Sequence, residues 1–151
     1  MATNLEASHV FLDVPATTRD EALKFAADKA VELGASTDAA ALLKGLQDRE
    51  AEGSTGMLSG FAIPHCKTAA VKDPCIVVMR FSNAIDWQTT DKSEVVAAIA
   101  LFIPDNDLGA ENLRILSKVA VMLMHEDFCS VVKDSQDAQA IVDAVNKGLE
   151  Q

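Results

Sequence analysis

A histidine that directly follows an apolar run is the residue of this chain best placed to do chemistry. The segment Gly-Phe-Ala-Ile-Pro-His-Cys-Lys, residues 60–67, puts His65 where a buried stretch should end. Pro64 lacks a backbone N–H and has a fixed φ, so we expect His65 at a strand end rather than within a central strand. Imidazole, with an ordinary pKa of about 6.5, is mostly neutral in a cell, and a neutral ring nitrogen can attack phosphorus without a separate base. On spacing alone, the competing interpretation is a structural histidine.

Arg49 is a candidate anion-binding residue on a helix that precedes this segment. It follows Leu46 by three positions and Leu42 by seven, so it continues the buried face of a helix expected over residues 37–50. On the last turn of that helix, a guanidinium can offer a planar fork of donors to phosphate oxygens. It can equally well cover the carbonyl groups at the helix C-terminus. The spacing leaves both roles open.

Two further segments carry groups that can bind an anion. In the glycine-rich loop 53–60, the backbone N–H groups and the hydroxyls of Ser54 and Thr55 can donate near His65, although the loop lacks the Gly-Lys-Ser/Thr ending of a P-loop. Its glycines can also simply permit a tight loop. Asn112 begins the inward stripe of a helix expected over residues 111–124, where it is either an N-cap or an amide beside free N–H groups.

The elements that must position these residues alternate between strands and helices. Nearly continuous apolar runs rich in β-branched residues indicate strands covered on both faces, and periodic apolar stripes after capping residues indicate helices. This pattern predicts one α/β domain over residues 1–151, with helices packed on a sheet. The expected strands cover residues 9–14, 75–81 and 95–103. The first expected helix begins near Thr18, and the other expected helices cover residues 37–50, 111–124, 129–132 and 138–149.

The composition excludes several classes of partner. The chain has 13 Lys and Arg against 23 Asp and Glu and a net charge of −10, which argues against nucleic acid and anionic membranes. The acidic surface suits a basic protein partner, or serves only solubility. Three cysteines without paired spacing and three histidines give no zinc pattern, so we expect no metal and no cofactor. A reducing cytoplasm is the expected location.

An ordered set of segments resembles a known family over most of the chain. The set consists of Arg49-Glu50, residues 53–56, Ala62–Lys67, Ile85-Asp-Trp87 and Leu113–Ala120. Together they resemble the fructose/mannitol-type enzyme IIA domain, also called EIIA type-2, of the bacterial phosphoenolpyruvate-dependent sugar phosphotransferase system. The resemblance runs from about residue 5 to residue 149. It implies a three-layer α/β sandwich with a mixed sheet of about five strands flanked by helices on both faces.

The resemblance also implies a reaction and its partners. The phosphocarrier protein HPr donates a phosphoryl group to Nε2 of His65, which passes it to a cysteine of enzyme IIB, and the sugar receives it during uptake through the membrane enzyme IIC. Arg49 matches the family's phosphate-contacting arginine. Met57 and Phe61 are then expected to form part of the docking surface for both partners. The alternative is a nitrogen-type regulatory module that signals by its phosphorylation state.

The chain departs from the family pattern at two positions. Many relatives carry a second histidine immediately before the Leu-x-x-Leu of the late helix, where this chain has Asn112. An amide can donate a neutral hydrogen bond but cannot add positive charge in the transition state. Cys66 stands where glycine is commoner. Because neighbours in an extended chain point to opposite faces, Cys66 is expected to be a packed small residue rather than the nucleophile of a hydrolase.

Overall fold

The computed structural model describes residues 5–105 and 109–150, and within residues 109–113 it describes the backbone only. In the described part, no helix has the length and apolar character needed to cross a membrane. The elements in chain order are η1 (Ala7–His9), β1 (Val10–Val14), α1 (Arg19–Glu32), α2 (Ala39–Glu52), β2 (Phe61–Ala62), β3 (His65–Thr68), β4 (Cys75–Ile85), β5 (Val95–Pro104), α3 (Gly109–Met122), α4 (Glu126–Asp134) and α5 (Ala138–Glu150).

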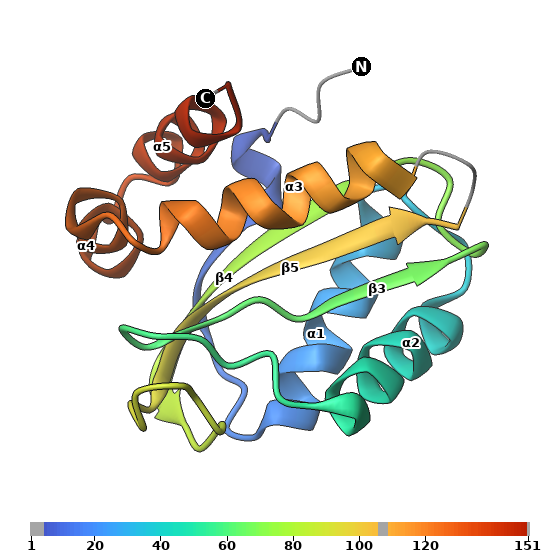
Figure 1. The fold of residues 1–151 in the computed structure, drawn as a ribbon, viewed down its shortest axis with the longest axis horizontal. Helices are drawn as coiled ribbons and strands as arrows, with labels where there is room; N and C mark the ends of the chain where they lie inside the picture. The colour runs from blue at the N-terminus through green and yellow to red at the C-terminus, as the bar shows by residue number, and fades with distance from the viewer. Residues whose placement is uncertain (1–4, 106–108, 151) are drawn as a thin grey trace.

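The strands form one mixed sheet in which β4 and β5 are central (Figure 1). β1 pairs with β4 in parallel, and β4 pairs with β5 antiparallel. On the other side of β5, β2 and β3 pair in parallel with it, one after the other, so that together they make an interrupted edge strand. The five-stranded mixed sheet that the resemblance implies is therefore confirmed.

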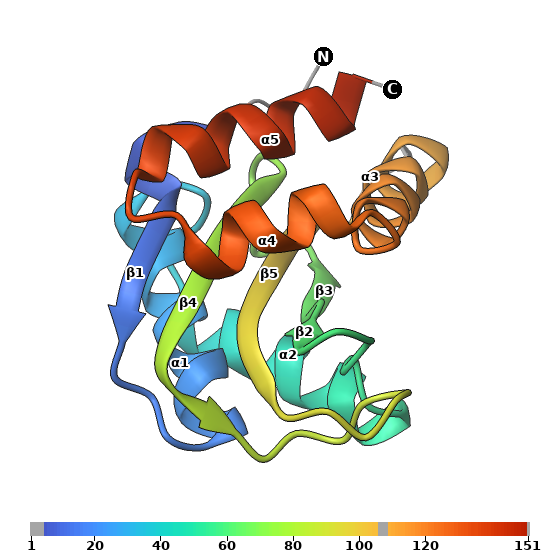
Figure 2. The same ribbon diagram turned by 90° about the vertical axis from the view of Figure 1, so that its left-hand side faces the viewer.

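Helices cover both faces of this sheet, as expected. Figure 1 and Figure 2 show α1 and α2 on one face, with α3, α4 and α5 on the other. Alternate residues of β5 enter different cores: Ala98, Ala100 and Phe102 pack toward α1 and α2, whereas Ala97, Ile99 and Leu101 pack toward the other helices. Covering on both faces explains the continuous apolar run of β5.

The helix starts follow the local capping signals. The backbone N–H of Glu21 donates to Oγ1 of Thr18 over 3.1 Å, which caps α1 as predicted. Asp38 caps α2 by accepting from the N–H of Ala41 over 3.0 Å, so α2 begins at Ala39 rather than near residue 37. α2 ends at Glu52, two residues later than expected, and Arg49 still lies in its last turn.

Candidate functional site

His65 lies at a strand end, but it begins β3 rather than following a buried strand, because the edge strand is interrupted at residues 63–64. It pairs with Leu101 within β5, and the N–H of Leu101 donates to the carbonyl oxygen of Pro64 over 2.9 Å. The break between β2 and β3 lies at residues 63–64, because Pro64 has no backbone N–H to donate to the neighbouring strand. The half-buried His65 therefore lies along the edge of the sheet, rather than beyond its end.

Two hydrogen bonds fix the tautomer of the His65 ring. Nδ1 lies 2.9 Å from the carbonyl oxygen of Ile63, which can only accept, so Nδ1 carries the proton. Nε2 lies 3.2 Å from Nε of Arg49, which can only donate, so Nε2 carries a lone pair. Both contacts select the same tautomer, in which Nε2 is the ring nitrogen with the available lone pair.

The surroundings keep this ring uncharged at neutral pH. Burial is the largest influence and lowers the pKa of His65, and the positive charge of Arg49 lowers it further. The hydrogen bond to the Ile63 carbonyl and the negative charges of Glu50 and Glu52 act in the opposite direction. Because the pKa stays below its ordinary value, the lone pair on Nε2 is available at the pH of a cell.

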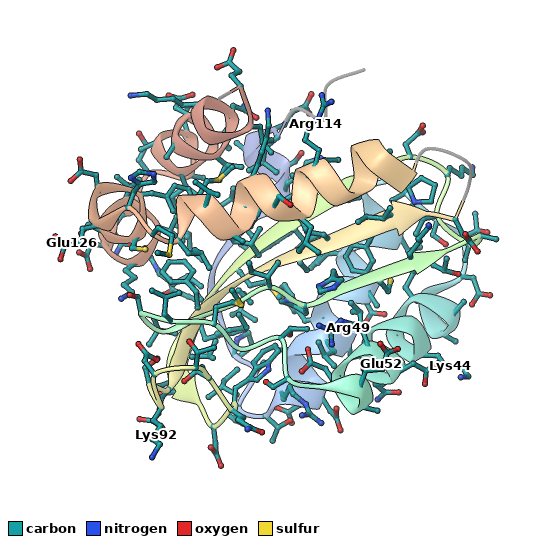
Figure 3. The ribbon with its side chains drawn as sticks, viewed as in Figure 1. Lys44, Arg49, Glu52, Lys92, Arg114 and Glu126 are labelled. Atoms are coloured by element: carbon teal, nitrogen blue, oxygen red, sulfur yellow. The ribbon has the colours of Figure 1, made fainter. Side chains whose placement is uncertain are left out.

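Arg49 extends from the last turn of α2 toward β3, as Figure 3 shows. Besides the contact with His65, its Nη1 donates to the carbonyl oxygen of Gly53, the residue that ends α2, over 2.7 Å. The side chain thus covers a carbonyl at the end of the helix and also reaches the imidazole. The structure brings Arg49 and His65 together across 16 positions of sequence.

The hydroxyls of Ser54 and Thr55 already have partners within the protein. Oγ of Ser54 donates to the carbonyl oxygen of Gln88 over 2.6 Å, and Oγ1 of Thr55 donates to Oε2 of Glu50. The backbone N–H of Thr55 also donates to Glu50, to Oε1 over 3.1 Å. Among the described hydrogen bonds, none joins Ser54 or Thr55 directly to His65.

Glu50 and Trp87 adjoin this site, although neither was among the residues predicted to bind the anion; Trp87 was expected to be an aromatic residue at the edge of the core or on a partner surface. Glu50 is 6% exposed and Trp87 is 3% exposed, and the indole Nε1 of Trp87 donates to Oε1 of Glu50 over 3.4 Å. A signal for Glu50 was present: it follows Leu42 and Leu46 at intervals of four, so it continues a buried row of α2. A carboxylate on a buried row needs donors, and the loop supplies them.

Cys66 points away from the site and packs against α2. Its Sγ lies 3.9 Å from the carbonyl oxygen of Leu42, and burial raises the pKa of the thiol to about 12. A Cβ added at Gly45 would lie 3.0 Å from Cβ of Cys66, so the two small residues face each other closely. The expectation of a packed small residue is confirmed, and a thiol with this pKa is no nucleophile at neutral pH.

The remaining predicted residues have different outcomes. Phe61 is 0% exposed, so the expectation that it forms part of a docking surface is wrong: its ring packs in the core beneath α3, α4 and α5. Met57 is half-buried and keeps part of its surface in solvent. Asn112 belongs to α3, and its side chain lies outside the described residues. Among the side chains of residues 5–105 and 114–150, no group of three or more His, Cys, Asp or Glu could hold a metal ion.

Comparison with known proteins gives consistent matches over most of the chain. Residues 3–148 match the family model described as phosphoenolpyruvate-dependent sugar phosphotransferase system, EIIA 2. A fructose-specific EIIA component of Haloferax volcanii is 32% identical over 141 residues, covering 93% of this chain and 91% of the relative. A fructose-like EIIA component of Escherichia coli is 32% identical over 138 residues, covering 91% and 92%. The crystal structure of the nitrogen regulatory protein IIA-Ntr from Neisseria meningitidis superposes with a TM-score of 0.85 at 26% identity, covering 93% of this chain and 94% of that one.

Proposed function

Because the chain belongs to the EIIA 2 family of the phosphoenolpyruvate-dependent sugar phosphotransferase system, we propose that His65 accepts a phosphoryl group from HPr and passes it to a cysteine of an enzyme IIB. The observation that carries this proposal is the unprotonated Nε2 of His65, 3.2 Å from Nε of Arg49. A neutral nucleophile beside a guanidinium suits phosphoryl transfer, which needs an in-line attacking atom and donors for the equatorial oxygens.

In the first step, the lone pair of Nε2 forms a bond to phosphorus while the bond from phosphorus to a histidine nitrogen of phospho-HPr breaks. The electron pair of the broken bond returns to the donor imidazole. The His65 ring then becomes positively charged, and its Nδ1–H strengthens the hydrogen bond to the Ile63 carbonyl oxygen. A donor that is itself a phosphohistidine requires no metal for this exchange.

Arg49 must change partners during this step. In the free protein its Nε–H donates to the lone pair of Nε2, the same electron pair that attacks phosphorus. The guanidinium must therefore leave Nε2 and turn its donors toward the phosphoryl oxygens as these approach. An arginine can exchange partners in this way because its five N–H donors lie in one plane.

In the second step, a cysteine thiolate of enzyme IIB attacks the phosphorus on His65. The bond between phosphorus and Nε2 breaks, its electron pair returns to Nε2, and the ring again becomes neutral. Both partners must reach the same nitrogen in turn, and His65 is suited to this because it lies half-buried on an edge strand. The half-buried side chains of Met57 and Leu58 on the adjoining loop are the apolar groups we assign to docking.

Three residues complete the proposed site in supporting roles. Asn112, at the beginning of α3, would donate a neutral hydrogen bond to the phosphoryl group where many relatives have a histidine. Ser54 and Thr55 would contact the group directly only by leaving Gln88 and Glu50, so we assign them to the shape of the loop first. We propose that the exchange takes place in the cytoplasm and serves sugar uptake through a fructose- or mannitol-like enzyme IIC.

The proposal is tested by incubating the chain with enzyme I, HPr, phosphoenolpyruvate and candidate enzyme IIB proteins. Acid-labile phosphate should appear on the wild-type chain and be absent from His65→Ala. Addition of the cognate enzyme IIB should then move the label from the histidine to the thiol. Label that persists in a folded His65→Ala variant would contradict the assignment of the nucleophile.

The similarity to a nitrogen regulatory protein favours one alternative function. In that case, His65 would accept the phosphoryl group from HPr, and the phosphorylated and free forms would bind another protein differently. The assay above separates the two functions. A chain that becomes phosphorylated, transfers to no enzyme IIB of its own cell and binds a protein in only one of its two states would be a regulator.

A further inference from the structure

Glu50 is a buried carboxylate that the transfer mechanism does not use directly. Three donors converge on it: the backbone N–H of Thr55 over 3.1 Å, the hydroxyl of the same residue, and the indole N–H of Trp87 over 3.4 Å. None of the described ion pairs includes Glu50. Burying a charge is costly, so an uncharged residue would serve better here if the only task were to fill the core.

A continuous path of hydrogen bonds leads from this carboxylate to the imidazole. The carbonyl oxygen of Thr55, whose N–H and hydroxyl bind Glu50, accepts from the N–H of Ile63 over 3.0 Å. The carbonyl oxygen of Ile63 in turn accepts from Nδ1 of His65 over 2.9 Å. Thr55, at one end of a short segment, therefore bonds to Glu50, and Ile63, at the other end, bonds to the His65 ring.

The path closes on itself through Arg49. Nε of Arg49 donates to Nε2 of His65, and Nη1 of Arg49 donates to the carbonyl oxygen of Gly53. The N–H of Gly53 in turn donates to the carbonyl oxygen of Glu50 over 3.1 Å. Since Arg49 and Glu50 are neighbours in α2, one turn of helix holds both sides of the imidazole. Arg49 contacts Nε2 of His65. Glu50 binds Thr55, which holds Ile63, and the carbonyl oxygen of Ile63 contacts the protonated Nδ1.

We propose that Glu50 is a positioning residue for the transfer reaction proposed above: through Thr55 and Ile63 it holds His65 in the tautomer with an unprotonated Nε2. The role is indirect, because Glu50 touches neither the ring nor the phosphoryl group. Its negative charge also favours the positively charged ring formed during transfer, in keeping with its effect of raising the pKa of His65. The charged groups that act on the ring are Arg49, Glu50 and Glu52.

The most informative substitution is Glu50→Gln, which keeps the size and removes the charge. A carboxylate offers only acceptors, whereas a glutamine amide keeps one acceptor for the N–H groups of Thr55 and Trp87 and meets the Thr55 hydroxyl with an NH₂ group, so that the hydroxyl must turn and accept. The contacts to a charged acceptor become neutral ones of about half the strength, and the hold on the segment that carries Ile63 weakens. We expect the tautomer with a proton on Nε2 to become populated, and transfer from phospho-HPr to slow by about tenfold to a hundredfold, as for outer partners of metal-bound histidines.

The tautomer is measured on the free protein, by NMR of chain labelled with ¹⁵N in its histidines. The His65 signals are identified by their loss in His65→Ala, since the chain has three histidines. Glu52→Gln is the matched control: Glu52 is exposed at the end of α2, is labelled in Figure 3, and also raises the pKa of His65. It should leave the tautomer unchanged, because it removes a nearby charge without touching Thr55, and any change in its transfer rate measures what the loss of a charge alone contributes.

The outcomes separate this inference from the proposed function. A tautomer shift in Glu50→Gln but not in Glu52→Gln supports positioning, even if the chain never accepts a phosphoryl group. A chain that is phosphorylated normally while Glu50→Gln keeps the wild-type tautomer and rate would overturn the inference alone. If Glu50→Gln does not fold, Thr55→Val removes one donor and leaves the carboxylate. A folded Thr55→Val variant should shift the tautomer in the same direction, and an unshifted one would overturn the inference.

Discussion

Replacing Arg49 with alanine should slow phosphoryl transfer to His65 by about thirtyfold, and the figure follows from two opposing changes. A guanidinium that contacts the moving phosphoryl group stabilises the transition state by about 3 kcal/mol, the size found for a lost oxyanion donor. In the wild type, part of this gain is offset because the 3.2 Å hydrogen bond between Nε of Arg49 and Nε2 of His65 must first break. Breaking it costs about 1 kcal/mol. The net loss in the variant is about 2 kcal/mol, or about thirtyfold in rate.

The rate is best measured in a single turnover, by rapid mixing with labelled phospho-HPr and quenching in alkali, so that release of HPr does not mask the chemical step. Lys44→Ala is the matched control, because Lys44 is an exposed cation on the same helix, is paired with Asp48 over 2.8 Å, and is labelled in Figure 3. It should transfer at the wild-type rate. An Arg49→Ala variant that folds normally and also transfers at that rate would remove the guanidinium from the mechanism.

Three further predictions follow from the same structure. Because burial lowers the pKa of His65 below its ordinary value of about 6.5, the transfer rate should fall toward acidic pH with a midpoint below that value, as the ring becomes protonated; a midpoint above it in the pH–rate profile would contradict this. With pKa values raised to about 12 and about 11, the buried thiols of Cys66 and Cys75 should resist iodoacetamide at pH 8 in the folded protein and react after unfolding in denaturant, as followed by mass spectrometry. Gly56→Ala should lower the melting temperature strongly, because the new Cβ would lie 1.9 Å from the carbonyl oxygen of Gln88, and unchanged thermal unfolding would show that the loop can move aside.

Much of the fold was predictable because its signals are local. Thr18 and its partner Glu21 mark the start of α1, and the apolar runs of β4 and β5 reflect burial on both faces. The ranges of β2 and β3 were not predicted, although a strand end was expected at His65. They contain two and four residues, and their pairing with β5 is a long-range interaction that leaves no period in so short a segment.

The candidate site was predictable where a residue's type limits its chemistry. The imidazole of His65 and the guanidinium of Arg49 follow from residue type together with position, and the structure places them in contact. The hydrogen bonds that hold these two side chains in place were not predictable, because they depend on backbone carbonyl groups. The contact between Ile63 and the ring has no signature in side-chain type, and the three donors on Glu50 come from a loop and from the residue two positions after β4.

The distance between α2 and the edge strand is set by a glycine and a cysteine that face each other. Gly45 faces Cys66, and a Cβ at position 45 would lie 3.0 Å from Cβ of Cys66 and 3.3 Å from its Sγ. Four residues further along the helix, Arg49 spans the same gap to reach the imidazole. This pair therefore acts as a spacer whose combined volume decides whether the guanidinium can span the gap. A bulkier residue at either position would move α2 away from β3. A protein with glycine at position 66 could accommodate alanine at position 45, and the distance that Arg49 must span to His65 would stay the same.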